Sequence, residues 1–169
     1  MTDLAEPLLL RSIERAEANL QRQLEWVGRH DARSSFVTGI SIAMLGYLAT
    51  VTPAMDRWTV WLVASFLTAV ALLLASLVCI YLGQYPKTKS QNASLLFFDT
   101  ISGLHFDEYR RRFIGMTDEA YLEDLLSQSH TNAGILRTKF RALKGTLIFI
   151  LLSVPPWAIA TYLSKLLST

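Results

Sequence analysis

Long runs without a charged residue alternate along this chain with segments rich in charge. The runs are Ser34 to Met55 with 22 positions, Trp58 to Pro86 with 29, and Gly145 to Ser164 with 20. A hydrocarbon core of about 30 Å needs roughly 20 helical residues, so each run is long enough to cross a membrane. A buried helix of a soluble protein would carry a polar face over such lengths, which these runs lack. The pattern therefore predicts three transmembrane helices.

The charged segments show helical spacing of their apolar residues. An amphipathic helix is predicted from Pro7 to Arg33, because apolar residues recur every three or four positions at Leu9, Ile13, Ala16, Leu20, Leu24 and Val27. A second long helix is predicted from an N-cap at Thr117, and it continues into the third run. Its seam of steps of four and three comprises Leu122, Leu126, Ser129, Ala133, Leu136, Phe140 and Leu143. Two short helices are expected between the second run and Thr117.

These elements predict an all-α integral membrane protein with three transmembrane helices and a cytoplasmic helical stalk. Its expected segments are a helix over 1–33, a transmembrane hairpin over 34–85 with spans at about 35–54 and 59–83, a cytoplasmic helical segment over 86–144, a third span over 145–164 and a periplasmic tail over 165–169. The hairpin follows from the short connection between the first two runs, which is too small to hold a domain.

The distribution of cations predicts the orientation. Of the 16 Lys and Arg residues, five precede the first run and nine lie between the second and third. Loops rich in Lys and Arg stay in the cytoplasm, so the N-terminus and the middle segment are expected there. The protein is accordingly expected to be multi-pass.

The sequence offers little for catalysis. His30, His105 and His130 are far apart without metal-ligand spacing, and the single cysteine, Cys79, lies within the second run. No glycine-rich phosphate loop or nucleophile elbow is present. The adjacent carboxylates Glu123 and Asp124 point in different directions on a helix and are expected to solvate a surface. We expect no catalytic residue, no metal, no cofactor and no enzyme activity.

A basic cluster in the middle segment has two interpretations. Arg110, Arg111 and Arg112 could hold a phosphate by bidentate hydrogen bonds, with Tyr109 available to stack on a base. The same cations could instead form a solvated face that enforces topology or touches anionic head groups. The residues alone favour the second interpretation.

Polar residues near the predicted seams also leave alternatives open. Gln128 and Asn132 lie four apart on the long helix, where their amides could read a pyrimidine edge, pair with each other or fix the helix register. Asp31 and Arg33 lie at the entry to the first span, where an ion pair with another helix would order the stalk.

Two prolines interrupt the third run. Pro155 and Pro156 free backbone carbonyl groups and can bend a helix. They are hinge candidates, and a static kink is an equally good interpretation.

Three groups of residues resemble motifs of the Pycsar transmembrane effectors. The first is Gln23, Leu24, Glu25 and Trp26 followed by His30, Asp31, Ala32, Arg33 and Ser34; the second is Asn92 with Leu95, Leu96, Phe97 and Phe98; the third is Tyr109, Tyr121, Leu122, Leu125, Gln128, Asn132, Ile135 and Lys139. The likeness runs from about Leu20 to Phe149. Arg33, where the family pattern has lysine, and His30 depart from it without changing the charge pattern.

The resemblance implies an antiphage effector of the bacterial inner membrane that causes abortive infection. Its activating ligand would be cUMP or cCMP made by a partner pyrimidine cyclase, sensed within residues 86–144, with the lipid bilayer as target, a homo-oligomer as the acting form and no nucleic acid partner. The expected contacts are Arg110, Arg112, Lys139 and Arg141 for the phosphate, Phe97, Phe98 and Tyr109 for the base, and Asn92, Gln128 and Asn132 for its polar edge. The rival hypothesis is a ligand-independent membrane scaffold or a small channel or holin-like protein.

Overall fold

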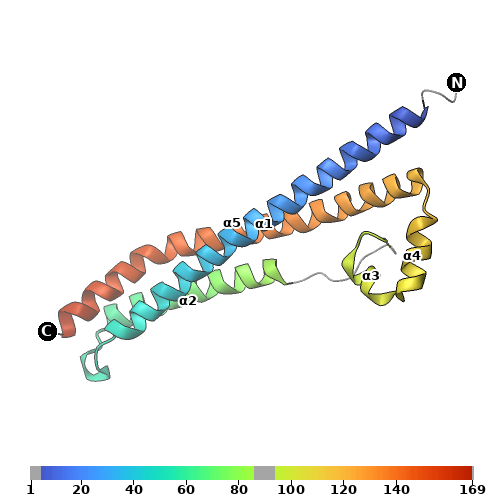
Figure 1. The fold of residues 1–169 in the computed structure, drawn as a ribbon. Coiled ribbons are helices and arrows are strands. Elements are labelled where there is room, and N and C mark those ends of the chain that lie inside the picture. Colours follow the sequence, from blue (N-terminus) through green and yellow to red (C-terminus); the bar gives the residue numbers. More distant parts are fainter. Residues whose placement is uncertain (1–4, 86–93, 169) are drawn as a thin grey trace. The chain divides into compact units, whose positions relative to one another are not determined.

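A computed structural model describes residues 5–85 and 94–168 of the chain. Along the chain it contains α1 (Ala5–Val51), the 3-10 helix η1 (Met55–Arg57), α2 (Val60–Gln84), α3 (Phe98–Gly103), α4 (Phe106–Ile114) and α5 (Asp118–Ser168) (Figure 1). All regular elements within the described ranges are helical, which confirms the predicted all-α class.

Three of these helices, α1, α2 and α5, are long and apolar enough to cross a membrane. The prediction of three spanning helices is thereby confirmed. In α1 and α5 the apolar stretch continues from the charged stretch without a helix break, over 47 and 51 residues respectively. Pro155 and Pro156 both lie inside α5, and the helix continues through them.

Local capping explains where the helices begin and end. The Thr59 side chain accepts a hydrogen bond from the Leu62 amide at the start of α2, at 3.3 Å. Thr117 does the same for the Ala120 amide before α5, so the N-cap expected at Thr117 is confirmed. α1 ends two residues before Pro53, since the residue preceding a proline is driven out of helical geometry.

The chain divides into two compact units. The first unit comprises Met1–Arg29 and Pro86–Arg137, and the second comprises His30–Tyr85 and Thr138–Thr169. Each long helix, α1 and α5, contributes residues to both units.

The core of the first unit lies between α1 and the start of α5. Ile13, Ala16 and Leu125 are buried there, and Leu96 from the segment before α3 packs against them. The Tyr121 hydroxyl donates a hydrogen bond of 2.8 Å to Glu17 Oε1. Apolar contact and this polar bond together hold the two helices side by side.

The second unit packs α1, α2 and α5 around two apolar clusters with a layer of hydroxyl groups. One cluster is centred on Leu48, Leu62, Ala69, Leu73 and Ala160, and the other on Val37, Ile80 and Leu143. Ser41 Oγ lies 3.0 Å from Ser76 Oγ, and Thr146 Oγ1 donates to the Ser76 carbonyl at 3.4 Å. All three side chains are fully buried, so each spanning helix brings one hydroxyl to this hydroxyl layer.

Large apolar side chains cover the outside of the second unit. Phe36 on α1, Leu67 and Val78 on α2, and Leu151 on α5 are each more than half exposed. In water this outer surface would be unfavourable, whereas in a bilayer it faces lipid tails. The unit is therefore built with polar hydroxyls inside and hydrocarbon outside, as suits a membrane protein.

The buried face of α5 differs from the predicted seam at alternate positions. Leu125, Leu136 and Leu143 are buried, but Leu126 and Phe140 are 50% and 44% exposed. Ala133 is also exposed. The true seam keeps the steps of three and four but replaces these three residues by Leu125, Asn132 and Lys139. The hydrophobic pattern differs from the packed face because polar side chains, Asn132 and Lys139, occupy two of these three positions.

Close approach between spanning helices occurs at Gly83 and Gly145. A Cβ on Gly83 would lie 2.2 Å from the Ala142 Cβ, and one on Gly145 would lie 2.7 Å from Cys79 Sγ. Gly39 and Gly46, by contrast, have nothing within 4 Å of an added Cβ. Small residues let helices approach closely in lipid, and here α2 and α5 use this device.

Candidate ligand-binding site

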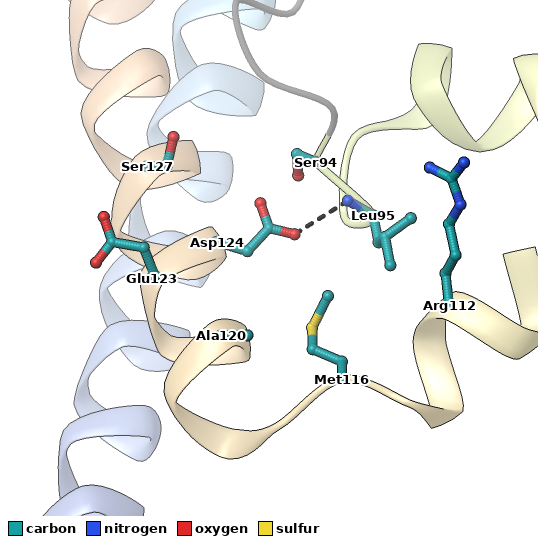
Figure 2. A pocket seen from close by; sticks show the side chains of 8 residues that line it. All are labelled: Ser94, Leu95, Arg112, Met116, Ala120, Glu123, Asp124 and Ser127. Atoms are coloured by element: carbon teal, nitrogen blue, oxygen red, sulfur yellow. Dashed lines mark hydrogen bonds between the residues drawn. The ribbon is translucent and has the colours of Figure 1, made fainter.

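The first unit contains a cavity of about 350 Å³ between the start of α5, the end of α4 and the segment that precedes α3. Its lining among the described residues is shown in Figure 2: Ser94, Leu95, Arg112, Met116, Ala120, Glu123, Asp124 and Ser127. Pockets for small molecules occupy roughly 300–1,000 Å³, so this cavity is large enough for a ligand of modest size.

Asp124 fixes one wall of the cavity. Its Oδ2 accepts a hydrogen bond of 3.0 Å from the Leu95 amide, and its side chain points toward Leu95 in Figure 2. Ser94 Oγ accepts a second backbone hydrogen bond, from the Leu96 amide at 3.1 Å. Ser94 and Leu95 are both buried. The Asp124–Leu95 bond thus ties the segment before α3 to α5, and the Ser94–Leu96 bond orders the segment internally.

Arg112 supplies the positive charge of the cavity. It lies in the last turn of α4 and forms an ion pair with Glu108 one turn earlier on the same helix. The guanidinium has five N–H donors, and this contact uses one of them. About half of the side chain is exposed, so the remaining donors are accessible to a ligand.

The lining combines donors and acceptors around an apolar floor. Arg112 lies on one side and Asp124 on the other, with Leu95 and Met116 between them in Figure 2. Such a cavity suits a molecule with an apolar ring, one anionic group and one hydrogen-bond donor. No group of three or more His, Cys, Asp or Glu residues capable of holding a metal ion occurs over 5–85 and 94–168.

The predicted contacts are only partly assembled around this cavity. Arg112 lines it, whereas Arg110 is exposed elsewhere on α4. Phe97 and Phe98 stack on each other with ring centroids 4.7 Å apart. Tyr109 packs against a neighbouring phenylalanine of α4 and is outside the lining.

Two of the three predicted amide contacts, Gln128 and Asn132, also lie outside the lining. Gln128 is buried and Asn132 half-buried on α5 within the first unit. Asn92 lies outside the described residues. Their assignment to the polar edge of a base stays a prediction.

Lys139 and Arg141 belong to the second unit. Lys139 Nζ lies 2.7 Å from Asp31 Oδ1, which joins α5 to α1, and the lysine side chain is only 15% exposed. Arg141 and Arg33 are both exposed. Lys139, which the resemblance assigns to the phosphate, is thus paired with Asp31. Asp31 was expected to form an ion pair with another helix, and it does so with this lysine.

A buried histidine completes this group in the second unit. His30 is 1% exposed, its Nδ1 lies 3.3 Å from Ser34 Oγ and 3.4 Å from Asp31 Oδ1, and its ring meets Phe140 edge-on. Burial raises the pKa of the Asp31 carboxyl, but hydrogen bonds with Lys139 and His30 outweigh this effect and lower the pKa overall.

The cavity residues that sequence reasoning missed are those without a distinctive pattern. Ser94, Met116 and Ala120 carry no motif, and Asp124 was interpreted as part of a solvated acidic pair with Glu123. Those two carboxylates do project in different directions (Figure 2). The available signal was the position of Asp124 two turns after the Thr117 cap, which places it beside the segment that α5 must pack against.

Comparison with known proteins gives one match. Residues 15–164 match the model of the Pycsar effector protein domain. Neither a curated protein nor a solved structure matches the chain.

Proposed function

The chain belongs to the Pycsar effector family and is therefore a membrane effector of the Pycsar antiphage system, and we propose that it is switched on by a cyclic pyrimidine mononucleotide. The ligand, cUMP or cCMP made by a partner cyclase, binds in the cavity of the first unit. The three spanning helices, acting in a homo-oligomer, then impair the bacterial inner membrane and cause abortive infection.

The cavity of the first unit is the observation that carries this proposal. It offers Arg112 for the phosphate, Leu95 and Met116 for the base, and Asp124 as acceptor for a hydroxyl or ring N–H. A cyclic mononucleotide presents these three features within one small molecule. Arg112 binds the cyclic phosphate through donors that its ion pair with Glu108 leaves unused.

The distribution of charge supports the proposed orientation. Fourteen of the 16 Lys and Arg residues lie before the first apolar run or between the second and third. By the positive-inside rule the first unit lies in the cytoplasm, where a cyclase product would accumulate. Arg57 and Lys165 are the two remaining cations, at the periplasmic side.

Binding must favour one conformation for the ligand to act as a switch. A ligand that binds the resting and active states equally shifts nothing, however tightly it binds. The contact that ties the segment before α3 to α5 is the candidate for this difference, since Asp124 accepts the hydrogen bond of the Leu95 amide.

The test is dye leakage from liposomes that contain the purified full chain. We expect leakage and a thermal shift with cUMP or cCMP, and neither with cAMP. Arg112→Gln should remove the response, while the matched control Arg111→Gln, on the same helix but outside the lining, should keep it. A protein that responds to neither pyrimidine nucleotide contradicts the proposal. Leakage without any nucleotide would instead indicate the channel or holin-like alternative.

A further inference from the structure

The charges that line the cavity are unusual for a phosphate site. Among the described residues of the lining, one cation, Arg112, is accompanied by two carboxylates, Glu123 and Asp124, and the arginine is already paired with Glu108. Arg110 and Arg111 are not part of the lining. The cavity therefore tolerates little additional negative charge.

Asp124 cannot easily turn away from a ligand. The Leu95 amide holds its Oδ2 at 3.0 Å, and the side chain lies on the cavity side of α5 (Figure 2). Glu123 projects in a different direction. Of the two carboxylates, Asp124 is the one placed to act on a bound molecule.

A cyclic phosphate and a linear one differ in charge. A cyclic phosphodiester has no second ionisable oxygen and carries one negative charge, whereas a phosphomonoester carries about −1.5 to −2 at pH 7 because its second pKa is about 6. A linear 5′-nucleotide with the same base also has a free 3′-hydroxyl and lacks the phosphate ring. Of these differences, charge is the one that a charged side chain in a small cavity distinguishes directly.

From this geometry we infer that Asp124 is a specificity residue that excludes linear, dianionic pyrimidine nucleotides from the cavity. The inference rests on the proposed function, since it concerns the same site. Arg112 balances the single charge of a cyclic phosphodiester, and Asp124 repels the second charge of a monoester. An effector built this way ignores the linear pyrimidine monophosphates of the cell and responds to the singly charged cyclic product of the cyclase.

The test compares the affinity of the full-length protein, in detergent, for cUMP, cCMP, 5′-UMP and 5′-CMP by calorimetry. At pH 7.5 the linear nucleotides should bind at least tenfold more weakly than their cyclic counterparts. Lowering the pH to 5.5 protonates the monoester, so the affinity for 5′-UMP and 5′-CMP should rise several-fold while that for cUMP and cCMP stays nearly constant.

The matched variant is Asp124→Asn. The asparagine oxygen still accepts the Leu95 amide hydrogen, so the wall of the cavity is preserved while its charge is removed. The variant loses the second carboxylate oxygen as an acceptor for cyclic and linear nucleotides alike, whereas loss of the charge favours only the linear ones. The preference for the cyclic form should therefore shrink by roughly tenfold. Glu123→Gln, which removes a carboxylate that projects elsewhere, should change the preference much less.

The outcomes separate the two proposals. Equal affinity of the wild-type protein for cyclic and linear nucleotides would overturn the inference and leave the proposed function intact. A preference for the cyclic form that is unchanged in Asp124→Asn and independent of pH would overturn it too. Absence of binding by cUMP and cCMP would overturn both. The pH series on the wild-type protein tests the inference even if the variant does not fold.

Discussion

The ammonium group of Lys139 lies 2.7 Å from the Asp31 carboxylate and joins α5 to α1 within the second unit. Asp31 is 43% exposed and the lysine 15%, so this is a partly buried pair at the start of the spanning region. His30, beneath it, is almost completely buried. Helix pairing at this level therefore depends on charge as well as on apolar contact.

Removal of one partner should be costly because the other charge stays partly buried. Lys139→Ala is expected to lower the free energy of unfolding by about 1–3 kcal/mol, less than a fully buried pair would lose. The exposed neighbour Arg141→Ala should have almost no effect. Unfolding of the detergent-solubilised protein measures both. A double variant with Asp31→Ala that loses the sum of the single effects would show that the two side chains do not interact.

The same pair predicts a pH dependence. Because the pKa of Asp31 is lower in the folded protein than its ordinary value of 3.8, the carboxylate stabilises the fold above that pH. The stabilisation is lost as the pH falls below 3.8 through the folded pKa. The difference in unfolding free energy between wild type and Asp31→Asn should therefore be constant from pH 7 to about 5 and shrink below pH 4. A difference that grows on acidification would contradict the assignment.

Substitution of two glycines distinguishes the packed from the open helix faces. Gly83→Ala places a methyl group 2.2 Å from the Ala142 Cβ, so α2 and α5 must shift apart, at about 1–3 kcal/mol. Gly39→Ala meets nothing within 4 Å and should be neutral or slightly stabilising. Melting temperatures of the two variants in the same detergent provide the comparison. Equal melting temperatures would show that this close approach does not exist.

The hydrogen bond from Tyr121 to Glu17 should stabilise the first unit. Tyr121→Phe is expected to lower its stability by about 1 kcal/mol. Tyr109→Phe is the control, since the Tyr109 hydroxyl has no hydrogen-bond partner within the described residues. Hydrogen exchange of amides over 5–29 of α1 and at the start of α5 reports on this unit alone. Faster exchange in both variants would mean that loss of any tyrosine hydroxyl destabilises the unit.

The bond to Glu17 also raises the pKa of Tyr121, with burial and the nearby carboxylates acting in the same direction. The phenol therefore stays protonated to higher pH in the folded protein than in the unfolded chain. Its stabilisation should be complete below pH 10 and disappear as the pH rises through the folded pKa. Exchange rates of wild type and Tyr121→Phe should converge at strongly alkaline pH.

The spanning helices could be predicted from the sequence, whereas the packed faces could not. Charge-free length alone identifies a membrane span, because the bilayer excludes charge. The seam of α5 requires knowing which polar residues face a neighbouring helix. Hydropathy favoured Leu126, Ala133 and Phe140, but Asn132 and Lys139 occupy the packed positions. Polar residues at helix contacts carry no hydrophobic signal.

The cavity was equally inaccessible to sequence reasoning. Its lining joins residues from Ser94 to Ser127 that meet only after the segment before α3 folds against α5. Cations are the usual sequence signal for phosphate binding. Of the four predicted phosphate contacts, Arg110, Arg112, Lys139 and Arg141, the described lining contains Arg112. The acceptor, Asp124, is recognisable only through its hydrogen bond with the Leu95 amide.

The hydroxyl layer of the second unit has one further physical property. Ser41, Ser76 and Thr146 each lie within hydrogen-bond distance of a carbonyl on their own helix, at Val37, Leu73 and Ala142. If the three helices separate, every hydroxyl hydrogen keeps an acceptor, so disengagement strands no donor in hydrocarbon. Each helix therefore satisfies its own hydroxyl hydrogen when the contact is broken. The bonds of this layer between helices can therefore be lost at a smaller cost than if each hydroxyl had its acceptor only on a neighbouring helix.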